Sequence, residues 1–343
     1  MKDLMMKIAR RTMKMNLDVD GRGVWDWGAG VALYGLFRMY EYTKEKEIFD
    51  YIKNFVDYSL DSNVEIPKTV NTTAPLCSAL MLYTETGDKK YLNICIDFAR
   101  WLVDEAPRTT NGAIAHSGLS SLTGDIKVFA EQVWVDTIFM AGVFLTRLGT
   151  IVNNQEFLDE GMNQVKIHLN CLKSSNGLLY HGYNCADKNN MTAVLWGRGD
   201  SWFTVSVPEI MNFSKIENEE VTNGFKKQVE ALIECQDENG LWHTVLDNPD
   251  SYCEVSASAG FVYGILLGIR IGILGEEYMD CALKGAKAVI EKVAEDGTVT
   301  EVSTGTGIQV KPEMYCDMDK SKIMPWGQGL TIMMLMELDM LKK

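Results

Sequence analysis

A helical hairpin that recurs along the chain is the feature that most constrains its fold. Each unit consists of a helix rich in small and apolar residues, a short polar turn and a second, more amphipathic helix. The first helices are predicted to begin near residues 31, 74, 134, 201, 254 and 326, which makes six units. Helices that pair locally bury a continuous core only when the array is long or closes on itself. Without capping repeats, six hairpins favour closure into an all-α ring.

The first five units contain both helices, whereas the sixth lacks its second. The predicted pairs are Val31–Tyr42 with Ile48–Leu60, Ala74–Thr84 with Tyr91–Val103, Trp134–Leu148 with Phe157–Leu172, Ser201–Phe213 with Val221–Cys235, and Glu254–Ile273 with Tyr278–Val293. The last inner helix, Trp326–Leu341, has no partner downstream, so the N-terminal segment Met1–Leu17 is expected to complete its hairpin. Because repeat-built rings reach this size as one unit, residues 1–343 are predicted to form a single domain.

A second repeat follows the outer helices. Asn111-Gly112, Asn176-Gly177, Asn239-Gly240 and Asp296-Gly297 each mark a tight turn that leads into a short extended segment. These segments are expected on one rim of the ring, where the chain passes from an outer helix to the next inner helix. Three of the four histidines lie three or four residues after these glycines, namely His116, His181 and His243. The histidines and the starts of the inner helices are therefore expected around a common mouth.

The composition excludes some classes of partner. Hydrophobic residues make up 46% and charged residues 23%, as in an ordinary globular protein. The net charge of −14 argues against nucleic acid or a membrane surface, because both require basic patches. No stretch approaches the roughly 20 apolar residues of a membrane span. An anionic substrate would approach against the overall field, so its binding site is expected to hold a local cation.

The cysteines and the N-terminus indicate a cytoplasmic location. The eight cysteines include no CxxC pair and most lie in apolar helical stretches, which is typical of reduced thiols in a reducing compartment. Met1–Leu17 alternates basic and apolar residues, unlike a secretory signal peptide with its continuous apolar core. Because His and Cys residues do not cluster at ligand spacing along the chain, neither a metal site nor another cofactor is predicted.

Asp136 is the candidate catalytic residue. It lies at the start of the third inner helix, where the helix dipole favours a carboxylate by about 0.3–1 kcal/mol, and this alone would account for an acidic residue there. Its neighbours, however, are bulky and apolar, among them Trp134 and Phe139. Burial among such groups is expected to raise the pKa of Asp136, so that it holds a proton near neutral pH as a general acid must.

Residues 196–202, Trp-Gly-Arg-Gly-Asp-Ser-Trp, open the fourth inner helix. The glycines leave room for a close backbone approach, the planar guanidinium group of Arg198 matches a carboxylate, and the tryptophan rings offer flat faces to a sugar. In the alternative interpretation Trp202 belongs to the core and Arg198 pairs with an acidic residue of its own helix. Because a core does not need an arginine between glycines, substrate binding is the favoured interpretation of the cluster.

Other helix starts add candidate contacts. Four of the six inner-helix starts carry tryptophan, although helical cores prefer aliphatic side chains. Either Asn71 or Thr72 is expected to cap the second inner helix, and Asn71 is also a candidate substrate contact. His116 and His181 are candidates for hydrogen bonds to sugar hydroxyls or to the catalytic carboxylate. The candidate substrate-binding residues are thus Trp25, Trp27, Asn71, His116, His181, Trp196, Arg198, Trp202 and Trp326.

Together these segments resemble glycoside hydrolase family 105. The resemblance rests on Trp25-Asp-Trp-Gly with Leu33-Tyr-Gly, Trp134-Val-Asp-Thr-Ile-Phe-Met, Tyr180-His-Gly-Tyr, Trp196-Gly-Arg-Gly with Trp202, Leu241-Trp-His-Thr and Glu254-Val-Ser-Ala-Ser. The segments occur in order over nearly the whole chain. Members of that family are unsaturated rhamnogalacturonyl hydrolases, related to the unsaturated glucuronyl hydrolases of family 88.

The resemblance implies an (α/α)6 barrel and an uncommon mechanism. Lyases leave a C4=C5 double bond on the terminal uronic acid, and the family's aspartate, which matches Asp136, protonates this vinyl ether at C4 and directs water to C5. The hemiketal then collapses and releases the rest of the saccharide. Ordinary glycosidases need two carboxylates roughly 5–9.5 Å apart, and no second acid here compares with Asp136. Family members carry aspartate where this chain has Asn71, so the role of that position in activating water is open.

The expected function is therefore removal of an unsaturated galacturonyl residue from the non-reducing end of small rhamnogalacturonan- or pectin-derived oligosaccharides. The alternatives are glucuronyl specificity toward glycosaminoglycan- or gellan-type fragments, a sugar epimerase that uses His116 and His181, and a carbohydrate-binding protein without catalysis. The sequence leaves open whether the chain is a monomer or a homodimer, and whether residues 109–129 fold over the site as a lid.

Overall fold

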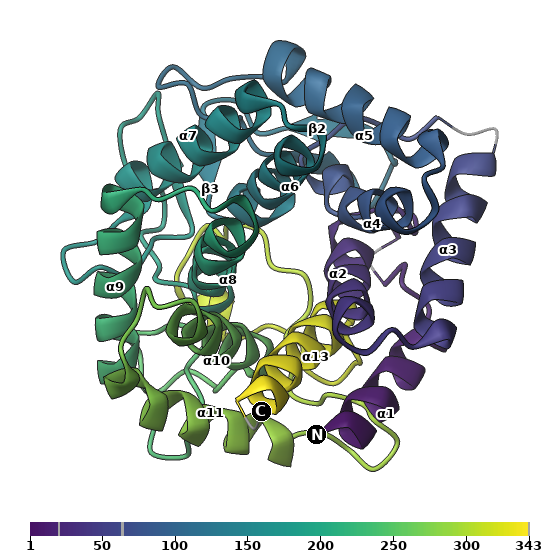
Figure 1. The fold of residues 1–343 in the computed structure, drawn as a ribbon. Helices are drawn as coiled ribbons and strands as arrows, with labels where there is room; N and C mark the ends of the chain where they lie inside the picture. The colour runs from purple at the N-terminus through teal and green to yellow at the C-terminus, as the bar shows by residue number, and fades with distance from the viewer. Residues whose placement is uncertain (20, 63–64, 342–343) are drawn as a thin grey trace.

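Two concentric rings of helices make up the computed structural model, which describes residues 1–19, 21–62 and 65–341 (Figure 1). The inner ring consists of α2 (Trp27–Thr43), α4 (Leu76–Thr86), α6 (Val143–Val152), α8 (Gly197–Ser214), α10 (Val255–Arg270) and α13 (Pro325–Met340). The outer ring consists of α1 (Lys2–Met13), α3 (Lys46–Asp61), α5 (Lys89–Arg100), α7 (Gln155–Leu172), α9 (Glu219–Glu234) and α11 (Met279–Glu291). Each of these inner helices packs on the outer helix of its own hairpin, and α13 packs on α1. The chain thus forms the (α/α)6 barrel that was predicted.

The two ends of the chain form the sixth hairpin, which confirms the predicted closure. Helix α1 packs on α13, and the Nε2 atom of Gln328 reaches the carbonyl oxygen of Ile8 at 3.5 Å and the hydroxyl of Thr12 at 3.3 Å. The amino group of Met1 lies 4.0 Å from a carboxylate oxygen of Asp339. Because the first and last helices meet in this way, the ring needs no capping repeats.

The two layers differ in how much of each helix they bury. Helices α2 and α13 are buried on nearly every side, whereas α3 buries one stripe that includes Ile48, Ile52 and Val56 at the helical spacing. Neighbouring inner helices approach closely where they carry glycine. A Cβ atom on Gly35 of α2 would lie 2.4 Å from the carbonyl oxygen of Gly329 in α13. The small residues of the inner layer are therefore required by the packing.

Two inner helices begin differently from the prediction. The second starts with a 3-10 turn, Asn71–Thr73, and only then becomes the α-helix α4. In the third, Trp134 ends strand β3 (Gln132–Trp134), Asp136 is in the first helical turn, and the π-helical segment Ile138–Gly142 precedes α6. The hydrophobic pattern indicates which stretch is buried, but it does not determine how the first turn is wound.

The four predicted rim turns share one geometry. In each turn the glycine has a φ between 87° and 100°, a region that favours glycine. The Asn or Asp before it accepts a hydrogen bond from the backbone N–H two residues later. The residue four before each glycine also forms a β-bridge with the residue two after it. The repeat is therefore confirmed, and it brings the chain from an outer helix toward the next inner helix.

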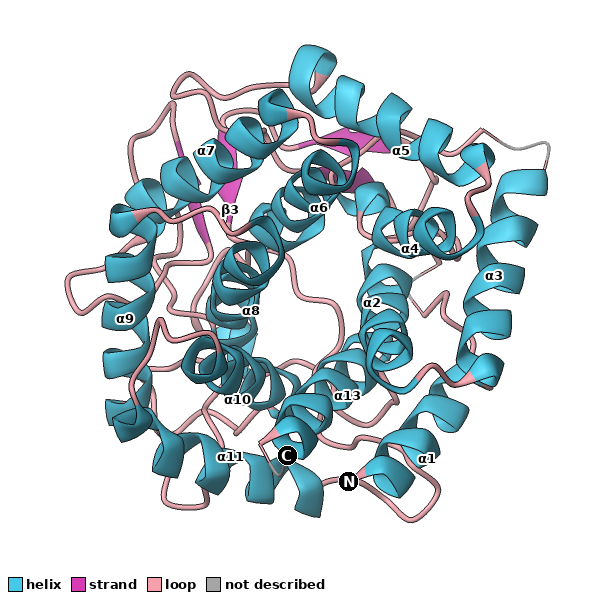
Figure 2. Cartoon of the chain, viewed as in Figure 1, coloured by secondary structure: helices cyan, strands magenta, loops and turns pink. Residues whose placement is uncertain are grey.

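Short strands complete this rim (Figure 2). Strand β1 (Ser117–Leu119) pairs with β2 (Ile126–Val128), and β3 pairs with β4 (Gly182–Asn184), both in antiparallel register. The remaining elements are π-helical residues 101–105, a 3-10 turn at residues 276–278 and the short helix α12 (Glu313–Cys316). All eight cysteines are free thiols. In the described part of the chain, no helix has both the length and the apolar character needed to cross a membrane.

Candidate active site

A cavity of about 640 Å³ opens at the end of the barrel where the inner helices begin. An outer helix returns the chain between successive inner helices, so all inner helices run in the same direction and their N-terminal ends converge on this mouth. Each N-terminal end carries a partial positive charge. The mouth is therefore locally suited to an anionic group, although the net charge of the protein is −14.

Five of the ten residues predicted for the site line this cavity. They are Trp27, Asn71, His116, Asp136 and Trp196. They come from the starts of four different inner helices and from the segment after the first rim turn, as the repeat predicts. The other five, described below, lie behind the cavity wall.

Asp136 ends a chain of polar side chains that begins at Tyr315. The Nε2 atom of His181 lies 3.4 Å from Oδ2 of Asp136, and Nδ1 of His181 lies 2.7 Å from the hydroxyl of Tyr315. That hydroxyl accepts a hydrogen bond from the backbone N–H of Gln309 at 3.3 Å, so its own hydrogen is available to Nδ1. This arrangement assigns the ring hydrogen of His181 to Nε2, where it faces Asp136.

The contact between His181 and Asp136 is long, and Asp136 also faces the cavity, where a bound molecule can reach it. Within the described residues, neither Oδ2 of Asp136 nor Nε2 of His181 has another hydrogen-bond partner. The side chain of Asp136 is 15% exposed, whereas that of His181 is almost fully covered. Buried polar groups are normally hydrogen-bonded, so this open pair indicates a place where a ligand supplies the missing partners.

His116 flanks the carboxylate on the cavity wall. Its ring stacks on Trp134, with centroids 4.4 Å apart and planes inclined by 4°, and its Nδ1 lies 3.0 Å from the hydroxyl of Thr137. Burial lowers the pKa of His116 to about 4, and burial also lowers the pKa of His181. Both rings are therefore neutral near pH 7.

The predicted rise in the pKa of Asp136 is wrong. Burial does act to raise it, but the hydrogen bond from His181 and the electrostatic interactions with His181 and His116 act in the opposite direction, and the pKa lies below its ordinary value. An N–H donor and the positive end of a helix both favour the charged carboxylate even when the histidines are neutral. In the free protein Asp136 is therefore ionised near neutral pH.

Arg198 does not reach the cavity. Its side chain is fully buried, and its guanidinium group lies 3.5 Å from Glu254 and donates to the carbonyl oxygen of Thr304 at 2.8 Å and to the hydroxyl of Thr306 at 3.1 Å. Residues 305–308, which follow this anchor, line the cavity. The predicted direct contact with a uronate carboxylate does not fit this geometry. Arg198 instead holds a loop of the cavity wall in place.

Three predicted tryptophans belong to the packed core behind the cavity. The Nε1 atoms of Trp25 and Trp326 donate to backbone carbonyl groups at 3.0 and 3.1 Å. Trp202 packs on Phe139, with ring centroids 5.1 Å apart, so the alternative interpretation of Trp202 as a core residue holds. Trp326 stacks on Trp27 at 4.4 Å and thereby supports a ring that does line the cavity.

The cavity also contains residues that the sequence did not single out. Arg22 and Lys127 are the cationic side chains among its described lining residues, and they supply the local positive charge that was expected of Arg198. Arg22 lies 3.9 Å from Asp26. Lys127 belongs to β2, whose hairpin with β1 forms part of the cavity wall. The segment considered as a lid is therefore part of the site in this structure.

Comparison with known proteins places the whole chain in one family. The family model described as Glycosyl Hydrolase Family 88 matches residues 1–342. The unsaturated rhamnogalacturonyl hydrolase YesR of Bacillus subtilis (strain 168) is 32% identical, and the match covers 98% of this chain and 94% of that protein.

Solved structures give the same result. The crystal structure of a possible member of the GH105 family from Salmonella enterica serovar Paratyphi A is 30% identical, with a TM-score of 0.92 over 100% of this chain and 94% of that chain. The unsaturated glucuronyl hydrolase of Bacillus sp. GL1 shares the fold, with a TM-score of 0.73 at 16% identity over 98% of this chain and 95% of that chain. The chain therefore belongs to glycosyl hydrolase family 88 and is a glycoside hydrolase built as an (α/α)6 barrel.

Proposed function

We propose that this enzyme removes an unsaturated galacturonyl residue from the non-reducing end of small rhamnogalacturonan- or pectin-derived oligosaccharides. The observation that carries the proposal is that Asp136 is the only carboxylate among the described residues lining the cavity. Displacement at a glycosidic bond takes two carboxylates, whereas hydration of a double bond needs one group that gives and recovers a proton. The relationship to an unsaturated rhamnogalacturonyl hydrolase at 32% identity supports galacturonyl over glucuronyl fragments.

In the proposed reaction Asp136 gives its proton to C4 of the C4=C5 double bond, and the positive charge that develops at C5 is shared with the ring oxygen. Water adds to C5 and returns a proton to the carboxylate of Asp136. The hemiketal then opens its ring, and the hemiacetal at C1 expels the remaining saccharide, so one water molecule is consumed. Arg22, Lys127 and the N-terminal ends of the inner helices provide the positive field that would hold the uronate carboxylate.

We propose that Asp136 takes up its proton when the substrate binds. A uronate carboxylate bound near Asp136 disfavours a second negative charge, and displacement of water by the sugar adds desolvation, so both effects raise the pKa of Asp136. His181, positioned by Tyr315, then orients the carboxyl group and donates to the carboxylate after the proton has left. Because Nδ1 of His181 is held by Tyr315 and the side chain is almost fully covered, this histidine does not suit the acid–base pair of an epimerase.

Asn71 has a positioning role in this scheme. It opens a 3-10 turn and packs closely against Gly118, where a Cβ atom would lie 2.5 Å from its Nδ2 atom. An amide can donate and accept hydrogen bonds but does not take up a proton at neutral pH. Asn71 can therefore hold a water molecule or a sugar hydroxyl, and the proton from water must go to Asp136.

The test follows the absorbance of the double bond in the ultraviolet. We expect the wild-type enzyme to consume this absorbance in a lyase digest of rhamnogalacturonan faster than in a lyase digest of chondroitin. Asp136→Asn should retain the circular dichroism spectrum of the wild type and lose activity by about 10³-fold, within the usual range for loss of a general acid. Near-wild-type turnover by Asp136→Asn would overturn the role of Asp136, and a preference for chondroitin fragments would overturn the substrate.

A further inference from the structure

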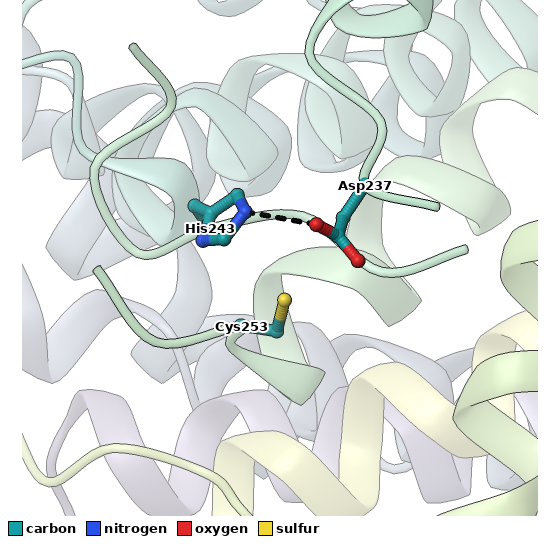
Figure 3. A group of neighbouring side chains, drawn as sticks. All are labelled: Asp237, His243 and Cys253. Atoms are coloured by element: carbon teal, nitrogen blue, oxygen red, sulfur yellow. Dashed lines mark hydrogen bonds and ion pairs between the residues drawn. The ribbon is translucent and has the colours of Figure 1, made fainter. Parts of the chain in front are cut away.

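We propose that Asp237, His243 and Cys253 form a binding site for a divalent transition-metal ion of the Zn²⁺ type, outside the active-site cavity. Figure 3 shows the three side chains converging from neighbouring stretches of residues 237–253, with the sulfur of Cys253 directed toward the space beside the other two. Their ligand atoms, a carboxylate oxygen, an imidazole nitrogen and a sulfur, lie within 4.8 Å of one another. The three residues are separated by five and nine others, which matches no common zinc motif, so the sequence alone predicts no metal there.

The hydrogen bonds of His243 leave two acceptor atoms facing each other. Its Nδ1 atom lies 2.5 Å from the carbonyl oxygen of Ser251, which can only accept, so Nδ1 carries a hydrogen. In a neutral ring Nε2 then bears a lone pair, yet this atom lies 3.2 Å from Oδ2 of Asp237, which is also an acceptor. Two acceptor atoms at this distance need a proton or a metal cation between them. Metal-bound histidines commonly donate their other N–H to a backbone carbonyl in this way.

The thiol of Cys253 favours a metal ion over a second proton. A proton between His243 and Asp237 would leave the sulfur of Cys253 without a role. Carboxylate, imidazole and thiolate together, in contrast, are a ligand set that suits Zn²⁺. With bonds of about 2.0–2.3 Å, tetrahedral Zn²⁺ places its ligand atoms roughly 3.3–3.8 Å apart, close to the separation of Nε2 and Oδ2. The Nδ2 atom of Asn239 lies 3.4 Å from the sulfur and can support a thiolate.

The charges around the cluster leave its ligands available. Lys284 donates to the backbone carbonyl of Asp237 at 2.9 Å, not to its carboxylate. Lys292 is paired with Glu301 at 2.7 Å. A metal ion that binds here displaces the proton of the Cys253 thiol, because a coordinating sulfur must be deprotonated. Because Asp237 and Cys253 are only half-buried, water can supply a fourth ligand.

The same residue types occur in triads that activate a cysteine nucleophile, but the geometry excludes this here. In a triad one ring nitrogen receives the proton of the thiol while the other is held by the carboxylate. In this cluster Nδ1 of His243 is held by the carbonyl of Ser251 and Nε2 faces Asp237. Neither nitrogen is left for Cys253, so a metal site is the chemistry that uses all three side chains.

A metal ion here would tie together a segment that supports the active-site wall. His243 and Cys253 face each other in a β-bridge. The residue after His243 accepts a hydrogen bond from the backbone N–H of Gly197 at 2.9 Å, and the residue after Cys253 is Glu254, the partner of Arg198. The metal would therefore stabilise the fold at this rim without touching the substrate cavity.

The experiment titrates the reduced, chelator-treated protein with Co²⁺, whose bond to a thiolate gives an intense near-ultraviolet charge-transfer band. We expect one equivalent to bind with this band. Cys253→Ser should lose it, and Cys281→Ser, which changes another half-buried thiol outside the cluster, should keep it. Asp237→Asn should weaken binding at least about 10-fold, as changes around metal ligands do. Zn²⁺ should raise the unfolding temperature of the wild type and of Cys281→Ser, but not of Cys253→Ser.

Two outcomes would overturn the proposal. One is a wild-type protein that binds no Co²⁺ or Zn²⁺, and the other is a charge-transfer band that persists in Cys253→Ser. If Cys253→Ser fails to fold, as judged by circular dichroism, the Co²⁺ titration of Asp237→Asn decides, because unchanged affinity there contradicts the proposed ligand set. Hydrolysis of the unsaturated saccharide is measured separately, so failure of the metal site leaves the assignment of Asp136 untouched.

Discussion

The barrel has a cavity at each end, and the two cavities have nearly equal volumes. They differ in whether the charged groups around them are already paired with one another. The cavity at the far mouth measures about 650 Å³, against about 640 Å³ at the Asp136 mouth. It is lined by the C-terminal parts of the inner helices and by Arg38, Arg147 and Arg270. The C-terminal end of a helix is negative, so cations gather there for the same reason that an anion is favoured at the other mouth.

Glu209 neutralises much of the positive charge at the far mouth. It accepts hydrogen bonds from Tyr34 at 2.7 Å, from Arg38 at 2.9 Å and from Tyr263, and it lies 3.6 Å from Arg147. Burial acts to raise the pKa of Glu209, but Arg38 and Arg147 outweigh it, so the pKa lies below its ordinary value and the group is ionised. The polar groups at this mouth therefore mostly satisfy one another.

At the Asp136 mouth the corresponding groups are left open. Within the described residues, Nε1 of Trp196 lacks a hydrogen-bond partner, and Oδ2 of Asp136 and Nε2 of His181 have only their long 3.4 Å contact with each other. Nε of Arg147 at the far mouth also lacks one, but its guanidinium group is packed among aromatic rings, 4.6 Å from the ring centre of Phe37. Cavity volume therefore does not distinguish the two mouths, whereas unsatisfied polar groups do. At the far mouth the buried charged groups pair with one another and stabilise the fold. At the Asp136 mouth the described polar atoms are not fully paired, so a ligand can supply the missing partners.

The largest effect is expected at the far mouth, from Glu209→Gln. This change leaves Arg38 and Arg147 without their buried counter-charge, and breaking a buried pair from one side costs about 3–5 kcal/mol. Urea unfolding should show this loss in the free energy of unfolding. The rate of hydrolysis per folded molecule should stay at the wild-type value, because Glu209 lies outside the substrate cavity.

Glu41→Gln is the matched control, since Glu41 pairs with the same two arginines but is about one-third exposed. Its cost should stay within about 1 kcal/mol. The pH dependence gives a second check. Because the pKa of Glu209 is lowered by folding, its stabilisation is present above the unfolded pKa and is lost as the pH falls through the folded pKa. The difference between wild type and Glu209→Gln should therefore shrink in acid, and equal costs for both variants at all pH values would contradict the comparison.

The second effect is expected at the Asp136 mouth, from His181→Phe. The ring keeps its place beside Trp196, but the N–H that faces Asp136 is lost. We expect kcat/KM to fall by about 10²-fold, the lower end of what a proton-transfer group contributes. Loss of the donor also destabilises the carboxylate, so the pKa of Asp136 in the free enzyme should rise, which the pH profile of kcat/KM measures. A fall in kcat/KM with an unchanged profile would mean that His181 acts only through packing.

The repeat and the approximate positions of the helix starts were accessible from the sequence, because apolar periodicity and Asn-Gly turns are local signals. From these signals Asp136, Trp27 and Trp196 could be predicted to lie at the same end of the barrel. The sequence could not show that Arg198 is buried, because the loop that covers it lies more than one hundred residues further along the chain. It also missed Tyr315, which follows no repeat and meets His181 across 134 positions.

The pKa of Asp136 was mispredicted for a related reason. Apolar neighbours along the chain indicate burial, and burial does raise the pKa. The donor that outweighs it, His181, belongs to a different rim turn, and its proximity is a property of the closed ring. Local sequence therefore reveals desolvation, while the partners that oppose desolvation become visible only in the fold.

A third, smaller effect concerns the pH profiles of the wild-type enzyme. Asp136 must be protonated to act as an acid, and the bound uronate carboxylate raises its pKa. The profile of kcat reports the complex and that of kcat/KM the free enzyme, so activity should be lost with rising pH at a higher value in kcat than in kcat/KM. A shift of about one unit corresponds to 1.36 kcal/mol of interaction. Coincident or reversed profiles would show that the substrate does not bring the proton to Asp136.

The smallest effect is expected from Tyr315→Phe, which removes a single hydroxyl from the end of the polar chain. Without it, Nδ1 of His181 no longer faces a donor, so the ring hydrogen can occupy Nδ1 instead of Nε2 and only part of the population presents N–H to Asp136. The loss of one such hydrogen bond, about 1 kcal/mol, should lower kcat/KM by roughly 5-fold and shift its pH profile in the same direction as His181→Phe, but less. In the double variant with His181→Phe the tyrosine change should have no further effect, since the ring it orients is absent. Additive losses in the double variant would show that Tyr315 acts on the site by some route other than His181.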